Sequence, residues 1–139
     1  MPFEIHPQLL ADCHVLGRVG SCHILLNGHA AVPWMIVVPE TKTTDYLDLP
    51  AAERETVGEI CAAVARFIKS HWQLEKTNFA GLGNVVPQLH LHVIGRKPTD
   101  PCWPGPIWGF LPAKTPYTEQ EVTDIVAGLQ TDLPGFQTD

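Results

Sequence analysis

The segment QLHLHV, residues 88–93, alternates two histidines and a glutamine with apolar residues. Side chains two residues apart in a β-strand point to the same face, so Gln88, His90 and His92 would share one face and the apolar residues the other. The apolar face can cover a core, while the polar face presents two imidazoles and a carboxamide on a rigid element. A neutral imidazole is a nucleophile near pH 7, so His90 could attack a phosphorus centre while His92 donates hydrogen bonds to its oxygens.

Spacing alone leaves three interpretations of this histidine pair open. In the first, His90 bonds covalently to phosphorus and transfers a nucleotidyl group. In the second, the histidines merely occupy a half-exposed sheet face. In the third they bind zinc, although no acidic residue or cysteine accompanies them to complete a metal site. The other histidines are predicted to be surface or locally satisfied side chains without a function: His6, His14, His23, His29 and His71.

The residues just before the histidines favour an anion site. A turn at Gly83 and Asn84, followed by Val85, would bring backbone N–H groups close to the histidines, and such groups can bind an oxyanion. Asn78 lies in a segment with strand character, where asparagine is disfavoured unless its side chain finds a partner. The chain carries a formal net charge of −6, so a bound phosphate would need such local help.

Composition narrows the class of protein. The 139 residues are 45% hydrophobic and 17% charged, which suits one compact core, so residues 1–139 are predicted to form a single domain. The acidic balance argues against a nucleic acid polymer or an anionic membrane as the main partner. No apolar run approaches the length of a membrane span. Four cysteines without a CxxC pair, and a start that lacks a secretory signal, favour a cytoplasmic location.

The N-terminal half has the patterns of β-structure. Residues 13–19 and 22–27 are predicted strands, and the intervening Gly20-Ser21 is predicted to form a hairpin turn. Residues 33–39 are rich in β-branched side chains and bounded by prolines, which predicts a third, mostly buried strand.

Residues 50–72 change to a helical period. Apolar residues recur every three or four positions, as at Val57, Cys61 and Val64, so one face of a long helix is predicted to be buried. Asp48 is predicted to cap the start of this helix, because its carboxylate could accept hydrogen bonds from the first free N–H groups.

Two further strands and a second helix complete the pattern. Residues 76–83 and 88–96 are predicted strands, the second carrying both histidines. Residues 97–109 contain too many prolines for a helix or a central strand. Residues 117–130 are predicted to form a short amphipathic helix opened by a Thr118 cap. Strands and helices segregated in this way predict an α+β fold with a mostly antiparallel sheet.

The sequence GNVVPQLHLHVI, which begins at Gly83, resembles the signature of the histidine-triad (HIT) superfamily, in which three histidines alternate with apolar residues. The likeness extends from about Cys13 through Trp108. It implies a sheet of about five strands with a long central helix and a short C-terminal helix, commonly paired into a homodimer. It also implies a hydrolase or transferase that acts on the α-phosphate of a nucleotide and requires no cofactor or metal.

The resemblance implies roles for individual residues. His90 falls on the middle histidine, which becomes nucleotidylated, and His92 falls on the last, which contacts the phosphate and the leaving-group side. Trp103 with its following proline resembles a tryptophan that reaches the neighbouring subunit's active site in dimeric members, while Trp108 is expected to have a structural role. The implied substrate-binding positions are Asn27, Asn78, Gly83, Asn84, Val85 and Trp103.

Two departures from the family pattern affect the expected chemistry. Gln88 replaces the first histidine, and an amide cannot take up a proton at neutral pH, so its predicted role in the catalytic site is to orient the neighbouring histidine or a backbone group. Asn27 stands where the family has an acidic residue that grips the ribose, so a charge-assisted contact is lost. The predicted function is a nucleotide hydrolase or transferase with a nucleotidyl-His90 intermediate. The alternatives are a nucleotide-binding or regulatory module with little activity and a metal-dependent hydrolase that uses His90 and His92 as ligands.

Overall fold

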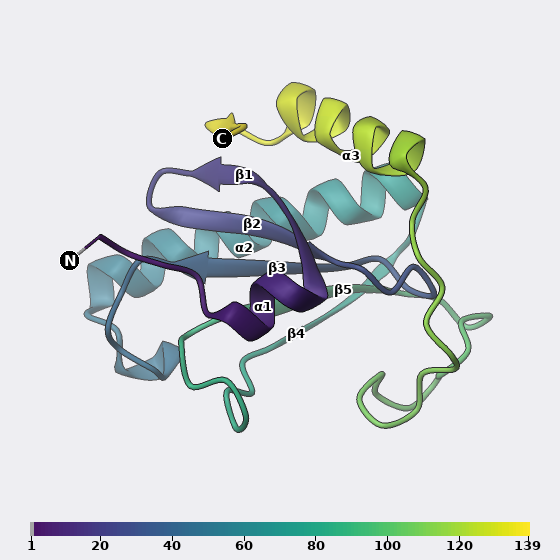
Figure 1. The fold of residues 1–139 in the computed structure, drawn as a ribbon, viewed down its shortest axis with the longest axis horizontal. Helices are drawn as coiled ribbons and strands as arrows, with labels where there is room; N and C mark the ends of the chain where they lie inside the picture. Colours follow the sequence, from purple (N-terminus) through teal and green to yellow (C-terminus); the bar gives the residue numbers. More distant parts are fainter. Residues whose placement is uncertain (1) are drawn as a thin grey trace.

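The computed structural model describes residues 2–139 and contains one six-stranded antiparallel sheet with helices on both of its faces (Figure 1). The strands lie in the order β4-β5-β3-β2-β1-β6. The elements in chain order are α1 (Pro7–Asp12), β1 (Cys13–Val19), β2 (Cys22–Asn27), β3 (Trp34–Pro39), the 3-10 helix η1 (Tyr46–Asp48), α2 (Ala51–Trp72), β4 (Lys76–Ala80), β5 (Leu91–Arg96), α3 (Glu119–Asp132) and β6 (Phe136–Gln137).

This arrangement confirms the predicted α+β fold, with one strand more than the five expected. β1 and β2 form the predicted hairpin, and Gly20 in its turn has a φ of +56°, which glycine adopts without a steric penalty. The additional strand, β6, has two residues and pairs with β1 at the edge of the sheet. Gly17 makes this pairing possible, because a Cβ atom there would lie 2.3 Å from the carbonyl oxygen of Gln137.

The main core lies between α2 and one face of the sheet. The apolar face of α2 is buried as its period predicts, and it packs on the alternate residues of the histidine segment, Leu89, Leu91 and Val93. Burying these leucines and the valine puts the side chain of His92 on the opposite face, since neighbouring strand residues point in opposite directions.

The prediction that Asp48 caps α2 is wrong. The residue at the N-cap is Pro50, and Asp48 is the last residue of η1. A residue that precedes proline is driven out of the helical region by the proline ring, and Leu49 accordingly has extended dihedral angles. The helix therefore starts only after Pro50, two residues beyond Asp48.

The second face of the sheet is covered by the N-terminal segment and by residues that follow β5. Phe3, Ile5 and Leu9 pack on Leu25 and Ile36. The short helix α1 belongs to this segment and was not predicted, because six residues are too few to establish a helical period. In Figure 1, α1 lies in front of the sheet and α2 lies behind it.

Both strands around the histidines are shorter than predicted. β4 ends at Ala80 and β5 begins at Leu91, so residues 81–90 form a connection that includes Gln88 and His90. Pro87 cannot donate to a strand ladder, and Gly83 has a φ of +64°, which is incompatible with a strand. The predicted C-terminal helix is present as α3, where Thr118 and Glu121 form the predicted capping box. Within residues 2–139 no helix has both the length and the apolar character needed to cross a membrane.

Candidate active site

Strand β5 carries His92 into the middle of the sheet, where Ile36 of β3 and Ala80 of β4 lie directly opposite it. His90 lies just before the strand begins. Only 5% of His92 and 8% of His90 are exposed to solvent, and their ring centroids are 4.9 Å apart. The structure therefore brings the two predicted catalytic histidines together in a nearly buried pair.

The hydrogen bond made by His90 identifies its reactive nitrogen. Its Nδ1 lies 2.7 Å from the carbonyl oxygen of Gln88. A carbonyl oxygen can only accept, so Nδ1 carries the hydrogen and Nε2 of the neutral ring presents a lone pair. An imidazole oriented in this way is arranged to attack an electrophile through Nε2.

The partner of His92 is Trp34, whose indole Nε1 donates a hydrogen bond of 2.9 Å to His92 Nδ1. Trp108 lies against the same imidazole, with ring centroids 5.2 Å apart and planes at 80°. Burial, followed by the nearby His90, lowers the pKa of His92 from 6.5 to about 4. His92 is therefore neutral at pH 7, and its hydrogen is on Nε2.

Gln88 has two separate functions in the structure. Its side-chain oxygen accepts a hydrogen bond from the backbone N–H of His6, and its side-chain nitrogen donates to the carbonyl oxygen of Glu4, both at 2.9 Å. The amide thus holds the N-terminal segment in place. The backbone carbonyl of the same residue orients His90.

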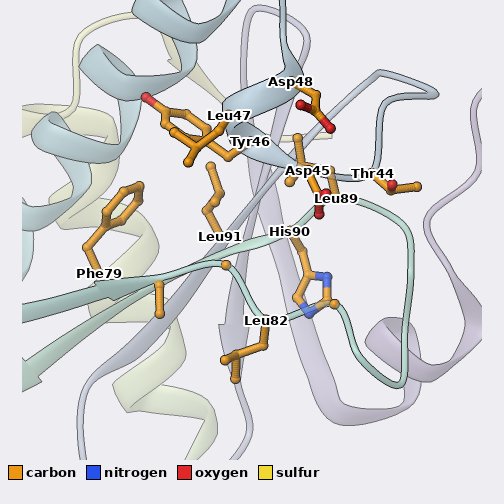
Figure 2. Close-up of a pocket in the computed structure, with 13 residues that line it drawn as sticks. Thr44, Asp45, Tyr46, Leu47, Asp48, Phe79, Leu82, Leu89, His90 and Leu91 are labelled. Atoms are coloured by element: carbon orange, nitrogen blue, oxygen red, sulfur yellow. The ribbon is translucent and has the colours of Figure 1, made fainter.

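A cleft of about 490 Å³ opens beside His90 (Figure 2). One wall consists of residues 44–48, including Thr44 and Asp45, and another consists of the end of β4 and residues 81–83. Its floor is formed by Leu89, His90 and Leu91. The cleft combines apolar surface with the imidazole of His90, as a site for a small organic molecule does.

The predicted anion-binding turn borders this cleft. Gly83 lines it directly. Asn84 and Val85 follow on the exposed part of the connection, where 90% of Val85 is accessible to solvent. An apolar side chain with so much exposure contributes little to the core.

Asn78 and Trp103 lie in a neighbouring cluster around Arg96. Asn78 Oδ1 accepts a hydrogen bond of 2.8 Å from Arg96, which supplies the side-chain partner that the sequence required. Only 2% of Arg96 is exposed, and its guanidinium makes two hydrogen bonds to Asp100 and one to the carbonyl oxygen of Gly105. It also lies over the Trp103 ring, 5.7 Å from the centroid. Arg96 thus ties Asn78 and Trp103 together on the histidine face of β4 and β5.

The side chain of Asn27 is engaged in a local turn. Its Oδ1 accepts a hydrogen bond of 2.9 Å from the backbone N–H of His29, immediately after β2 ends. The side-chain NH2 group of Asn27 can only donate hydrogen bonds to a sugar hydroxyl, whereas a carboxylate at this position would only accept them.

The tryptophans at His92 are the functional candidates that sequence reasoning missed. The sequence predicts only that Trp34 lies in a buried strand and that Trp108 has a structural role. No local pattern could identify Trp34, because it lies 58 positions from His92 in the chain. The expectation agrees with the structure for His6, His29 and His71, which make hydrogen bonds or stack on a neighbouring ring. His23 Nε2 lies 2.9 Å from Glu40, but its buried Nδ1 has no hydrogen-bond partner within residues 2–139.

Potential metal ligands do not gather in the described part of the chain. Among residues 2–139, no three histidine, cysteine, aspartate or glutamate side chains are placed to hold one ion. The four cysteines are unpaired thiols.

Comparisons with known proteins agree with this fold. A family model described as the HIT domain matches residues 8–99. A histidine triad protein from Sinorhizobium meliloti is 33% identical, with a TM-score of 0.88 over 94% of this chain and 97% of that one. A histidine triad protein from Marinobacter aquaeolei is 39% identical, with a TM-score of 0.86 over 94% and 96% of the two chains.

More distant structures share the fold alone. The diadenosine triphosphate hydrolase of Plasmodium falciparum, solved in complex with Cyclomarin A, has a TM-score of 0.63 at 16% identity and covers 93% of this chain and 81% of its own. No curated protein matches the sequence.

Proposed function

Because this chain belongs to the HIT family, we propose that it is a nucleotide hydrolase or transferase in which His90 attacks the α-phosphorus of a nucleoside phosphoramidate or a dinucleoside polyphosphate. The observation that carries this proposal is the hydrogen bond from His90 Nδ1 to the Gln88 carbonyl, which leaves the Nε2 lone pair for attack. The diadenosine triphosphate hydrolase of P. falciparum, which shares the fold, supports the substrate class.

The proposed reaction has two displacements at phosphorus. In the first, the Nε2 lone pair forms a P–N bond while the bond from phosphorus to the leaving group breaks, and its electron pair departs with that group. The imidazole becomes positively charged, and the Gln88 carbonyl stabilises this charge through the Nδ1 hydrogen. In the second, water attacks phosphorus and loses a proton to the solvent, the P–N bond returns its electrons to Nε2, and a nucleoside monophosphate is released.

The surrounding residues would stabilise charge on the phosphoryl oxygens. The Nε2–H of His92 is a hydrogen-bond donor, and the backbone of Gly83, Asn84 and Val85 would provide further N–H groups beside the cleft. These donors are neutral, so an acidic protein could hold a phosphate through them without an unpaired lysine or arginine side chain nearby. Asn27, Asn78 and Trp103 would contribute to binding the rest of the nucleotide.

A second candidate is a nucleotide-binding or regulatory module that has lost most of its activity. The observation in its favour is that the Gln88 amide holds the backbone of residues 4–6, so it takes no part in moving protons. Such a module would bind a nucleoside monophosphate without turnover.

We also propose that the protein is a homodimer that joins at β4. This strand is at the edge of the sheet, so its outer backbone groups are free to pair with a second chain. Phe79 on β4 is 51% exposed and borders a second cleft of about 250 Å³, whose α2 wall consists of small residues. Exposed apolar surface next to an open strand suits a second copy of the same chain. The free thiols support our placement of the protein in the reducing cytoplasm.

The experiment that tests the enzymatic function measures AMP and GMP release from a panel of phosphoramidates and dinucleoside polyphosphates in the presence of excess chelator. His90→Ala should reduce release by roughly 10³-fold or more, because the nucleophile is lost. The matched control is His14→Ala, which removes an exposed imidazole and should retain full activity.

Other results would distinguish the rival functions. Release that the chelator abolishes and zinc or manganese restores would indicate metal-dependent hydrolysis. Nucleotide binding without release would indicate the binding module. Equal activity of wild type and His90→Ala would rule out covalent chemistry at His90.

A further inference from the structure

The sheet register places Trp34 beside His92. On β3 and β5, Ile36 lies opposite His92 and Trp34 lies opposite Ile94, so Trp34 and His92 are diagonal neighbours on one face. Diagonal residues in a sheet are within reach of a long aromatic side chain. The indole spans this distance and donates its hydrogen bond of 2.9 Å to His92 Nδ1.

This hydrogen bond has only one possible direction. The indole nitrogen carries a hydrogen and cannot accept, so His92 Nδ1 must be the acceptor. A protonated His92 would direct a second N–H at the indole N–H over the same 2.9 Å, and the two donors would repel each other. The tryptophan therefore opposes the cationic form of His92 and fixes the hydrogen of the neutral form on Nε2.

The other neighbours of His92 offer no charge to offset this effect. Ile36 from β3 and Ala80 from β4 lie opposite it, and Trp108 covers the ring from the segment after β5. The titratable group that faces it is His90, whose positive charge after attack would disfavour a second cation still further. Burial by these residues contributes to the lowered pKa of His92, about 4.

Among residues 2–139, the side chains around the nucleophile include no cationic group that could give up a proton. Gln88 is a neutral amide whose hydrogen bonds are used by the N-terminal segment. The hydroxyl of Tyr46, which lines the cleft, donates to the carbonyl oxygen of Arg54. Asp45 and Asp48 contribute carboxylates, which accept rather than donate when ionised.

We propose that Trp34 is a positioning residue that locks His92 as the neutral Nε2–H form, and that the site consequently selects substrates whose leaving group departs without taking a proton. This inference rests on the proposed function. In a dinucleoside polyphosphate the P–O bond breaks, and its electron pair leaves on a phosphate oxyanion that is stable in water. In an alkyl phosphoramidate the P–N bond would have to release an amide anion unless the nitrogen were first protonated. His92 held in the neutral Nε2–H form donates a hydrogen bond to the leaving group but cannot transfer a proton to it. Cleavage of an alkyl phosphoramidate is therefore disfavoured.

The lock itself can be tested by NMR, independently of activity. In the wild-type protein labelled with ¹⁵N, the shifts of the His92 ring should show a protonated Nε2 and an unprotonated Nδ1 from pH 5 to pH 8. Trp34→Phe keeps an aromatic ring but removes the donor, and it should raise the His92 pKa by about one unit or more. Trp72→Phe is the matched control, because it makes the same change on α2, on the other face of the sheet from His92, and it should preserve the tautomer and the pKa of His92. A wild-type protein in which His92 Nδ1 carries the hydrogen would refute the proposal that Trp34 holds His92 in the neutral Nε2–H form.

Substrate selection is tested by comparing leaving groups on one nucleotide. The substrates are a series of aryl esters of AMP, diadenosine triphosphate and an alkylamine phosphoramidate of AMP. In the wild type, kcat/KM should rise as the pKa of the departing phenol falls, and the alkyl phosphoramidate should be cleaved at least about 100-fold more slowly than the p-nitrophenyl ester. Trp34→Phe should reduce the ratio of the two cleavage rates about tenfold at pH 6, whereas Trp72→Phe, on the other face of the sheet, should leave the ratio unchanged.

The two proposals fail in different ways. If the alkyl phosphoramidate is cleaved as fast as the aryl ester and diadenosine triphosphate, the proposed selection by leaving group is refuted. The proposed nucleotide hydrolase activity would still hold. If none of these substrates releases AMP, the proposed function fails, and the NMR measurement still decides whether Trp34 locks His92.

Discussion

At the scale of single residues, His92 shows how position changes the chemistry of a side chain. The same imidazole in solution would titrate near neutral pH, but here burial and His90 lower its pKa to about 4. Gln88 shows the complementary case, since its backbone and side chain act on different partners. Neither role follows from residue type alone.

The lowered pKa of His92 predicts a specific dependence of stability on pH. The unfolded chain takes up a proton at His92 near pH 6.5, whereas the folded protein does so only near pH 4. Between these values the unfolded state binds more protons, so the free energy of unfolding falls as the pH falls, by up to about 3 kcal/mol from this residue. His92→Asn should remove this part of the dependence.

Urea denaturation at pH 7.0 and pH 4.5 measures the effect. The loss of stability on acidification should be smaller in His92→Asn than in the wild type, while the exposed His14→Asn should behave as the wild type. Equal losses in all three proteins would show that His92 titrates normally.

At the scale of elements, the end of β5 is fixed by an ion pair between Arg96 and Asp100. Arg96 Nε and Asp100 Oδ2 are 2.8 Å apart, and both side chains are only 2% exposed. Burial raises the pKa of Asp100, but hydrogen bonds from Arg96 and from the N–H groups of Cys102 and Lys97 outweigh it and hold the pKa at about 2. The pair anchors the proline-rich segment that carries Trp103 and Trp108.

Breaking this pair should be costly. Asp100→Asn would leave the buried guanidinium without a counter-charge, and it should lower the free energy of unfolding by roughly 3–5 kcal/mol. Urea denaturation at pH 7 measures this change. Asp132→Asn, which removes an exposed carboxylate at the end of α3, should change the stability by less than about 0.5 kcal/mol. A similarly small effect of Asp100→Asn would show that the pair contributes little.

At the scale of the whole molecule, the proposed dimer depends on the free edge of the sheet. Light scattering should give a mass of twice 15.3 kDa for the wild type. Phe79→Glu should give a single-chain mass, because a charge would then lie within the apolar interface. The matched control is Phe110→Glu, which changes an exposed phenylalanine, 64% accessible, outside β4 and should remain dimeric. A single-chain mass for the wild type would exclude the dimer.

The amino-acid pattern predicts most of the secondary structure and the two faces of the histidine segment, although it misses α1 and β6 and makes β4 and β5 too long. Periodicity is a local property, so the burial of Leu89, Leu91 and Val93 could be predicted from alternation alone. The helix α2 was predicted from its apolar period, although its cap was not, because Pro50 overrode the capping tendency of Asp48.

The residues that surround the histidines are set by tertiary packing and do not follow from any local pattern. The order β4-β5-β3 places Trp34 on His92, and the N-terminal segment folds back to Gln88. Asn78 could be predicted to need a partner, but its choice of Arg96 depends on the pairing of β4 with β5. The physical reason is that strand order and register are set by packing across the whole sheet, and the local pattern of a single strand does not specify its neighbours.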